Sequence, residues 1–154
     1  VKKQLDQGST FSLANQLEID VAKLLKQHIP SAEQVRFGKN GADATTAAVK
    51  VARAFTKREH IAFCGYHGWH DWYLAANIKK DGLEKHLLKG ISPAGVPKEL
   101  AKTIYTFKYN DIKNLIKIIN SDNKIGIIKM EVARNFLPKS KFLKKIRDIC
   151  DKKK

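Results

Sequence analysis

The sequence predicts an α/β fold in which helices cover both faces of a mostly parallel sheet. Short apolar runs alternate with segments whose apolar residues recur at helical spacing, and this alternation is typical of such folds. One run, residues 125–130, is almost continuously apolar, as expected of a strand buried on both faces of a parallel sheet. With 154 residues, of which 43% are hydrophobic, the chain is also long enough to enclose a core.

The first elements are an arm and a helix. Residues 1–12 are polar and contain glycine, so we expect a loop or arm there. Residues 13–28 carry leucine and valine at helical spacing, and Pro30 closes this helix. We therefore divide the chain into an N-terminal arm and helix, residues 1–30, and a larger domain, residues 31–154.

A strand–helix–strand unit comes next, and the rest of the chain is organised around it. We expect strands over residues 35–38 and 61–64, joined by a helix over residues 42–55 with a right-handed crossover. The Asn40-Gly41 turn before the helix directs backbone N–H groups toward the ends of the strands, where ligands bind in open α/β sheets. The apolar residues that predict the helix are Ala44, Ala47, Ala48, Val51, Ala52 and Phe55.

The remaining elements continue the alternation of helices and strands. Glycines and prolines make residues 72–100 mostly irregular, with a possible helical turn over residues 83–88. A strand over residues 104–107 follows, and Asn110 is the expected N-cap of the next helix. The apolar run described above is the next strand, and a last helix begins near Ser140.

The net charge of +15 could indicate a polyanion partner. Lysines outnumber arginines by 25 to 5 and are spread through the sequence, whereas proteins that read nucleic-acid bases use arginine for paired hydrogen bonds. We therefore predict no nucleic-acid partner. A basic α/β domain that binds nucleic acid or another polyanion is the alternative function, and binding that falls steeply with salt would support it. A third possibility is an α/β scaffold that binds no ligand.

The sequence predicts a cytoplasmic protein without a metal or a membrane span. It contains no apolar run of 18 residues and no signal peptide. Its two cysteines, Cys64 and Cys150, suit a reducing compartment. Cys64, His67, His70 and Asp71 could supply metal ligands, but structural zinc sites pair two short ligand clusters and no second cluster follows. The chain lacks an initiator Met, so we expect it to begin within a longer protein.

Two motifs, NGAD at residues 40–43 and YHGWHD at residues 66–71, resemble those of the class III aminotransferases. These are fold-type I enzymes that use pyridoxal 5′-phosphate (PLP), and the resemblance is to the glutamate-1-semialdehyde 2,1-aminomutase branch. It spans nearly the whole chain and also includes residues 8–11, 17–18, 131 and 135. It implies that residues 31–154 are the N-terminal part of a PLP-binding large domain, so that the chain is an N-terminal fragment.

The resemblance assigns Asn40, Gly41 and Ala42 to the phosphate of PLP. A side chain at Gly41 would hinder the approach of the phosphate to the backbone, and the helix dipole favours an anion there. Family members usually have serine or threonine at the position of Ala42. Phosphate binding in this chain would therefore depend more on backbone N–H groups.

The other residues assigned by the resemblance surround the pyridine ring and the substrate. Tyr66 would stack on the ring, with His67 beside it. Glu131 would lie near the ring and its oxygen substituent, although family members commonly follow this residue with proline and this chain with valine. Ser9 and Asn135 would contact the substrate, a small amino compound.

Two groups that the family needs for catalysis are not expected in this chain. In the family, the aspartate that pairs with the pyridinium nitrogen and the lysine that binds PLP covalently lie further downstream. Asp148 and Asp151 fall in the last predicted helix, and no lysine here has the matching context. We therefore expect the PLP-binding portion of a transaminase or aminomutase that acts on an amino acid, amino-aldehyde or amino sugar. The whole enzyme would be a homodimer, and the fragment would be inactive alone.

Overall fold

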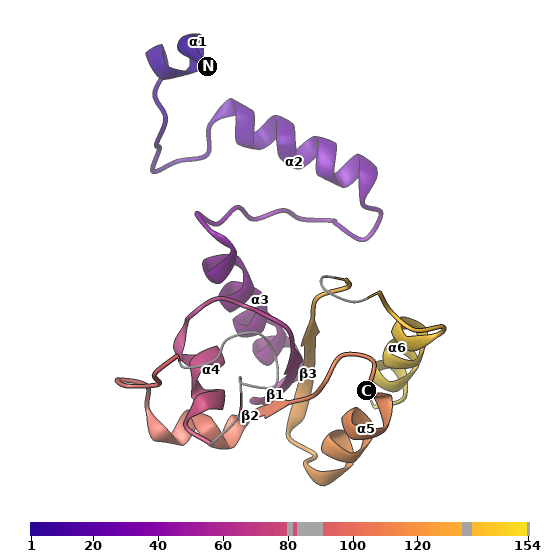
Figure 1. The fold of residues 1–154 in the computed structure, drawn as a ribbon. Helices are drawn as coiled ribbons and strands as arrows, with labels where there is room; N and C mark the ends of the chain where they lie inside the picture. Colours follow the sequence, from indigo (N-terminus) through magenta and orange to yellow (C-terminus); the bar gives the residue numbers. More distant parts are fainter. Residues whose placement is uncertain (80–81, 83–90, 134–136, 154) are drawn as a thin grey trace. The chain divides into compact units, whose positions relative to one another are not determined.

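The computed structural model describes residues 1–79, 82, 91–133 and 137–153. The chain forms two compact units, Val1–Lys39 and Asn40–Lys154. Figure 1 shows their helices and strands. The sequence analysis instead divided the chain after residue 30, between an N-terminal arm and helix and a larger domain. That division stays a prediction.

The first unit contains two helices, α1 (Lys2–Asp6) and α2 (Gln16–His28). Helix α1 lies within the segment expected to be a loop, so that expectation was wrong in part. Helix α2 begins later than predicted because a capping box fixes its start. The Asn15 side chain accepts a hydrogen bond from the Glu18 N–H (3.2 Å), and the Asn15 N–H donates to the Glu18 carboxylate (3.1 Å).

Residues 35–38 were predicted to form the first strand of the strand–helix–strand unit, and this prediction was wrong. Their backbone adopts no strand. A strand needs a neighbour to satisfy its N–H and C=O groups. The three strands found in the described part of the chain form one sheet with one another, so residues 35–38 have no ladder in this structure.

The second unit is built on a parallel sheet of β1 (His60–Cys64), β2 (Ile104–Thr106) and β3 (Ile125–Met130), in the order β2-β1-β3. Both pairings of the central strand β1 are parallel. The predicted α/β fold with a parallel sheet is therefore confirmed, and so are the three strands that the apolar runs predicted.

Side chains of β1 alternate between two hydrophobic cores, one on each face of the sheet. Helices α3 and α4 lie on one side of the sheet and α5 and α6 on the other (Figure 1). The core beneath α3 and α4 includes Val49, Ile61, Phe63, Trp72 and Tyr73. The core beneath α5 and α6 includes Ala62, Cys64, Leu115, Phe142 and Ile146.

Helix α3 (Gly41–Thr56) confirms the predicted helix, but most of its predicted apolar face is exposed. Val49 is its buried residue, whereas Val51 and Phe55 are 68% and 87% exposed. The spacing of the apolar residues predicted the helix correctly. These residues cover a broad part of the helix surface, so they did not identify the face that packs on the sheet.

The other helices are short. Helix α4 (Asp71–Leu74) is followed by two 3-10 helices, Ala75–Asn77 and Lys98–Thr103, and the helical turn predicted at residues 83–88 lies outside the described residues. The bounds of the last two helices are Ile112–Ser121 for α5 and Phe142–Lys152 for α6.

The N-cap of α5 differs from the predicted residue. Asp111 accepts a hydrogen bond from the Asn114 N–H (3.0 Å), whereas Asn110 was expected to do so. Helix α6 begins close to the predicted start at Ser140. No helix in the described part of the chain is both long and apolar enough to cross a membrane.

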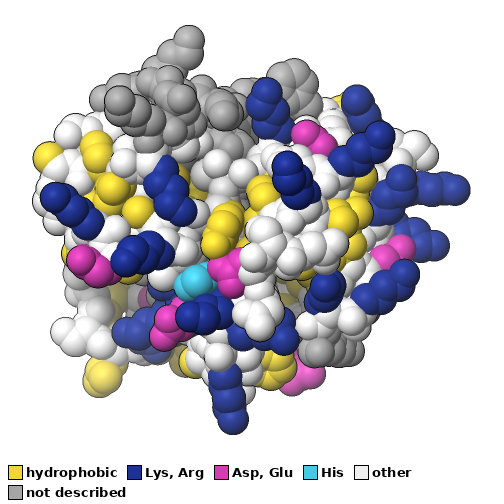
Figure 2. All heavy atoms as spheres, turned by 90° about the horizontal axis from the view of Figure 1, so that it is seen from below, with side chains coloured by type: hydrophobic (Ala, Val, Ile, Leu, Met, Phe, Trp, Pro, Cys, Tyr) yellow, Lys and Arg dark blue, Asp and Glu magenta, His cyan; other side chains and the backbone are white. Residues whose placement is uncertain are grey.

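Figure 2 views the structure from below and shows Lys and Arg side chains scattered over this face, with Asp, Glu and hydrophobic groups among them. A single continuous basic stripe is not seen on this face. The predicted lack of a nucleic-acid partner nevertheless stays a prediction.

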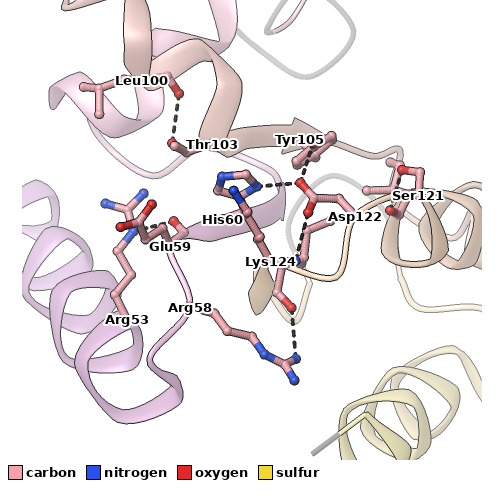
Figure 3. A network of polar contacts seen from close by, with 12 residues as sticks. Arg53, Arg58, Glu59, His60, Leu100, Thr103, Tyr105, Ser121, Asp122 and Lys124 are labelled. Carbon is pink, nitrogen blue, oxygen red and sulfur yellow. Dashed lines mark hydrogen bonds and ion pairs between the residues drawn. The ribbon is translucent and has the colours of Figure 1, made fainter.

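A polar network ties the three strands together where they begin (Figure 3). The Asp122 carboxylate lies 2.5 Å from the His60 Nδ1 atom and accepts hydrogen bonds from the Tyr105 hydroxyl (2.6 Å) and the Lys124 N–H (2.8 Å). The hydrogen bond from Tyr105, followed by those from His60 and Lys124, lowers the pKa of Asp122 to about 2 against the opposing effect of burial. The same bond raises the pKa of Tyr105 to about 12.

Asp122→Asn is expected to lower the free energy of unfolding by about 1 kcal/mol near neutral pH, because an amide accepts these hydrogen bonds less strongly than a carboxylate. The folded-state pKa of Asp122 lies below its ordinary value, so its contribution is present above about pH 4 and is lost as the pH falls toward about 2. Urea unfolding from pH 7 to pH 2 should show the difference shrinking over that window. Asp148→Asn, which removes an exposed carboxylate of α6, is the matched control.

Candidate functional site

The predicted site residues of the second unit that the structure describes lie at the start of α3 and just after the ends of β1 and β3. Strands β1 and β3 run parallel with Cys64 opposite Met130, so the chain leaves both strands at the same edge of the sheet. Tyr66 follows β1 and Glu131 follows β3 at that edge. This is the edge at which α/β proteins bind ligands.

Asn40 caps the start of α3 and leaves two backbone donors unused within the helix. Its side chain accepts a hydrogen bond from the Asp43 N–H (2.9 Å), and its backbone carbonyl accepts one from the Ala44 N–H (3.1 Å). The N–H groups of Gly41 and Ala42 precede these and have no acceptor inside the helix. They can therefore donate to an anion at the helix N-terminus, where the dipole also favours one.

Gly41 leaves open space at the same helix end. Its φ is not in the left-handed region, and a Cβ built on it would meet no heavy atom of the described residues within 4 Å, its chain neighbours and its own helix aside. Neither the backbone conformation nor packing against the described residues therefore requires glycine at this position. A group that approaches the backbone closely, as a phosphate would, fits this space.

The start of α3 is fastened to the loop after β1. The Thr45 hydroxyl lies 2.8 Å from the His67 carbonyl oxygen and 3.0 Å from that of Ala42. Gly68, with φ of 99°, packs so closely on the helix that a Cβ there would lie 2.6 Å from the Cβ of Ala42. The two sequence motifs, which are separated by a whole helix and strand, are therefore direct neighbours.

Gly68→Ala is expected to lower the free energy of unfolding by about 3 kcal/mol, because the new methyl group meets Ala42 and the backbone is left-handed. Chemical denaturation monitored by circular dichroism measures the loss. Gly95→Ala separates the two causes. Gly95 is also left-handed, with φ of 86°, but a Cβ there meets no heavy atom of the described residues within 4 Å, so a loss of about 1 kcal/mol is expected. Equal losses in the two variants would show that the contact with Ala42 is unimportant.

Tyr66 presents an aromatic ring at the site. Its side chain is 39% exposed, and its ring meets that of Tyr73 edge to face, with centroids 5.8 Å apart and an interplanar angle of 84°. Tyr73 is fully buried, so it gives the Tyr66 ring a fixed support. The exposed part of the ring is suited to stacking on a planar ligand.

His67, by contrast, lies inside the core and is 2% exposed. Its Nε2 atom lies 2.9 Å from the Cys64 carbonyl oxygen, which fits a protonated Nε2 that donates to it, and its ring stacks on Trp72 at 6.1 Å. This arrangement orients the loop that carries Tyr66. Direct contact of His67 with a cofactor stays a prediction.

The aromatic residues near this loop differ in burial. Trp72 and Tyr73 belong to the core, whereas Trp69 is 69% exposed and stacks on His70. The described residues contain no group of three His, Cys, Asp or Glu side chains placed to hold a metal ion.

Glu131 lies against Gly65, the residue just before Tyr66. Gly65 has φ of 94°, and a Cβ there would lie 2.7 Å from the Glu131 Oε2 atom. The half-buried carboxylate is thus held close to the base of the Tyr66 loop. Burial first, and then the negative charge of Glu131, raises the pKa of the Cys64 thiol to about 11. This thiol is therefore protonated near neutral pH and is a poor nucleophile.

The assignments of the two predicted substrate residues stay predictions. Ser9 is exposed and belongs to the first unit, and Asn135 lies outside the described residues. The sequence analysis did not identify three residues that build the candidate site: Thr45, Gly65 and Gly68. The glycines beside Tyr66 and His67 were a usable signal, because a loop that packs on a helix and a carboxylate favours residues without side chains.

The comparison with protein families decides what kind of chain this is. Residues 1–154 match the family model described as aminotransferase class-III. The chain belongs to the class III aminotransferase family. These enzymes are PLP-dependent, so the likeness seen in the two motifs is confirmed at the level of the family.

Relatives of this class III chain carry more than one activity in their names. A 3-aminobutyryl-CoA aminotransferase of Cloacimonas acidaminovorans is 35% identical over 153 residues, covering 95% of this chain and 33% of that protein. A glutamate-1-semialdehyde 2,1-aminomutase of Ignicoccus hospitalis is 37% identical over 159 residues, covering 98% and 36%. The chain thus spans about a third of the length of the curated relatives it matches.

The class III fold is also found in solved structures. The crystal structure of an omega-transaminase from Sphaerobacter thermophilus matches 99% of this chain and 37% of that chain, with a TM-score of 0.81 and 26% identity. A transaminase with PLP bound matches 99% of this chain and 36% of that chain, with a TM-score of 0.82 and 23% identity. The chain therefore has the fold of part of a fold-type I transaminase.

Proposed function

We propose that this chain is the PLP-binding portion of an aminotransferase or aminomutase that acts on an amino acid, amino-aldehyde or amino sugar. The observation that carries the proposal is the contact between the two motifs. Thr45 donates a hydrogen bond to the His67 carbonyl and Gly68 packs on Ala42, which supports a single site formed by the open helix end and the Tyr66 ring.

In this proposal the start of α3 binds the phosphate. The N–H groups of Gly41 and Ala42 donate to phosphate oxygens, while Asn40 fixes the helix end by capping it. Ala42 has no hydroxyl group, so the backbone supplies the contacts that a serine or threonine would share. The open space at Gly41 supports this assignment.

Tyr66 and Glu131 would act on the pyridine ring. Tyr66 stacks on one face of the ring and excludes water from it, and His67 keeps the loop in place from within the core. Glu131, beside Gly65, would accept a hydrogen bond from the oxygen substituent of the ring. PLP itself supplies an electron sink for bonds at the amino-bearing carbon.

Other parts of the proposal concern the whole enzyme. We propose a cytoplasmic homodimer, in which Ser9 and Asn135 contact the substrate and residues 31–154 are part of the large domain. The thiols of Cys64 and Cys150, which are free in this structure, support a reducing compartment. We also propose that this chain alone binds the cofactor weakly and turns over no substrate. The proposal is supported by the sequence contexts of the pyridinium aspartate and the PLP-binding lysine in the family, which no residue of this chain matches.

Calorimetric titration of the chain with pyridoxamine 5′-phosphate tests the proposal. This ligand has no aldehyde, so it does not react with the 25 lysines of the chain. We expect saturable binding to one site, competition by inorganic phosphate, and about five- to thirtyfold weaker binding of pyridoxamine, because a phosphate at a helix N-terminus contributes on the order of 1–2 kcal/mol. Equal affinities for the two ligands would contradict the phosphate site. Tight, strongly salt-dependent binding of DNA would instead favour the polyanion-binding alternative.

A further inference from the structure

Asn110, directly after Tyr109 in the loop that follows β2, uses its side chain like a peptide group. The amide nitrogen donates a hydrogen bond to the Leu137 carbonyl (3.1 Å), and the amide oxygen accepts one from the Lys139 N–H (2.9 Å). Asn110 itself has φ of 66°, in the left-handed region that asparagine tolerates better than most residues. Glycine would tolerate this backbone equally well but could make neither hydrogen bond.

Tyr109 contacts the same segment nearer to β3. Its hydroxyl donates a hydrogen bond to the carbonyl of Val132, the residue after Glu131. Its ring packs edge to face on Phe142 of α6, with centroids 5.1 Å apart and an interplanar angle of 65°. Phe142 is 3% exposed, so the Tyr109 ring is supported by the core beneath α5 and α6.

These two neighbouring side chains, which we call the 109–110 bracket, hold the chain after β3 at two points. Tyr109 fixes it at Val132, and Asn110 fixes it at Leu137 and Lys139. The first of these points is one residue beyond Glu131. The path of the backbone out of β3, and with it the direction of the Glu131 side chain, is therefore set partly by a loop from another strand.

We propose that Tyr109 and Asn110 are positioning residues that keep the Glu131 carboxylate against Gly65, at the base of the Tyr66 loop. Without the bracket, the backbone after Met130 would lose its side-chain contacts at 132, 137 and 139, and Glu131 would sample other directions. The use of Glu131 toward the cofactor depends on the proposed function. The bracket and the contact between Glu131 and Gly65 are properties of this chain alone.

Nuclear magnetic resonance of the 154-residue chain tests the bracket without any ligand. In Asn110→Gly, the Lys139 amide should exchange its hydrogen about fivefold faster, because a hydrogen bond contributes about 1 kcal/mol. The nuclear Overhauser effect between the Gly65 α-protons and the Glu131 γ-protons should fall by at least half. In the unsubstituted chain it is expected to be strong, since the Glu131 Cγ lies 3.4 Å from the position of a Cβ on Gly65.

Two further variants make the outcome decisive. Asn110→Asp keeps the acceptor for the Lys139 N–H and removes the donor to Leu137, so it should retain the Lys139 protection and still weaken the nuclear Overhauser effect. If Asn110→Gly does not fold, the nuclear Overhauser effect between Gly65 and Glu131 in Asn110→Asp still tests the proposal. Tyr105→Phe, which removes a phenolic hydroxyl from the network at the opposite end of the sheet, should change neither readout.

An unchanged Lys139 exchange rate in Asn110→Gly, or a full nuclear Overhauser effect between Gly65 and Glu131 in either Asn110 variant, would overturn the proposal. Failure of pyridoxamine 5′-phosphate to bind the unsubstituted chain would count against the proposed function instead. The ligand-free measurements would remain informative in that case, so the two failures can be distinguished.

Discussion

Gly41→Val is expected to weaken binding of pyridoxamine 5′-phosphate to the chain by about tenfold or more and to leave the binding of pyridoxamine almost unchanged. The branched side chain would occupy the open space at the start of α3 and keep a phosphate away from the N–H groups of Gly41 and Ala42. The fold should tolerate the change, because a Cβ at Gly41 meets no heavy atom of the described residues within 4 Å beyond its chain neighbours and helix. Calorimetric titration of both ligands measures the effect.

Ala47→Val is the matched control for this prediction. It adds a similar branched side chain to an exposed position of the same helix, away from its N-terminus. Its affinity for both ligands should equal that of the unsubstituted chain. If Gly41→Val left the binding of pyridoxamine 5′-phosphate intact, or weakened both ligands equally, α3 would not be the phosphate site.

Tyr66→Ala is expected to weaken the binding of both pyridoxamine 5′-phosphate and pyridoxamine by roughly five- to tenfold, because the loss of stacking affects the ring that the two ligands share. Tyr66→Phe keeps the aromatic face and should retain most of the affinity. Titration calorimetry measures both variants, and circular dichroism verifies that each remains folded. The pattern differs from that of Gly41→Val, which discriminates between the ligands.

Trp69→Ala serves as the control for Tyr66→Ala. Trp69 is an exposed aromatic residue of the same loop, but it stacks on His70. Its removal should leave both affinities unchanged. An equal loss in the Trp69 and Tyr66 variants would mean that the loop as a whole, rather than the Tyr66 ring, determines binding.

The sheet of this protein could be predicted because its strands are short apolar runs whose side chains pack into a hydrophobic core on each face of the sheet. Strands β1, β2 and β3 were all expected from such runs. Residues 35–38, in which two apolar residues alternate with Arg36 and Gly38, form no strand. A sequence pattern shows that a segment could pair, whereas pairing also needs a neighbouring strand, and that neighbour is not visible in local sequence.

The first residue of a helix was harder to predict from the sequence than the presence of the helix. Helix α2 begins where Asn15 and Glu18 cap each other, although the apolar period begins earlier. Helix α5 is capped by Asp111, while the adjacent Asn110 contacts the segment after β3. Both residue types are good caps, so the choice depended on a tertiary contact that no local rule predicts.

Residues of the candidate site could be proposed from the sequence where a motif carries the chemistry, and their roles toward a cofactor stay predictions. Asn40, Gly41, Tyr66 and Glu131 were assigned through the likeness to a family, and the structure brings their segments to one end of the sheet. Residues such as Thr45 were not found, because their roles are contacts between segments far apart in sequence. His67 was expected beside the cofactor, but its burial at 2% exposure could not be inferred from its place next to Tyr66.

The most direct test of a single site monitors the start of α3 and the Tyr66 ring in the same titration. Nuclear magnetic resonance can record the amide signals of Gly41 and Ala42 and the ring signals of Tyr66 as pyridoxamine 5′-phosphate is added. We expect all of these signals to shift with a single common Kd, and we expect pyridoxamine to shift only the ring signals of Tyr66. Shifts confined to one half of the site, or different Kd values for the two halves, would contradict a single site formed by the start of α3 and the Tyr66 loop.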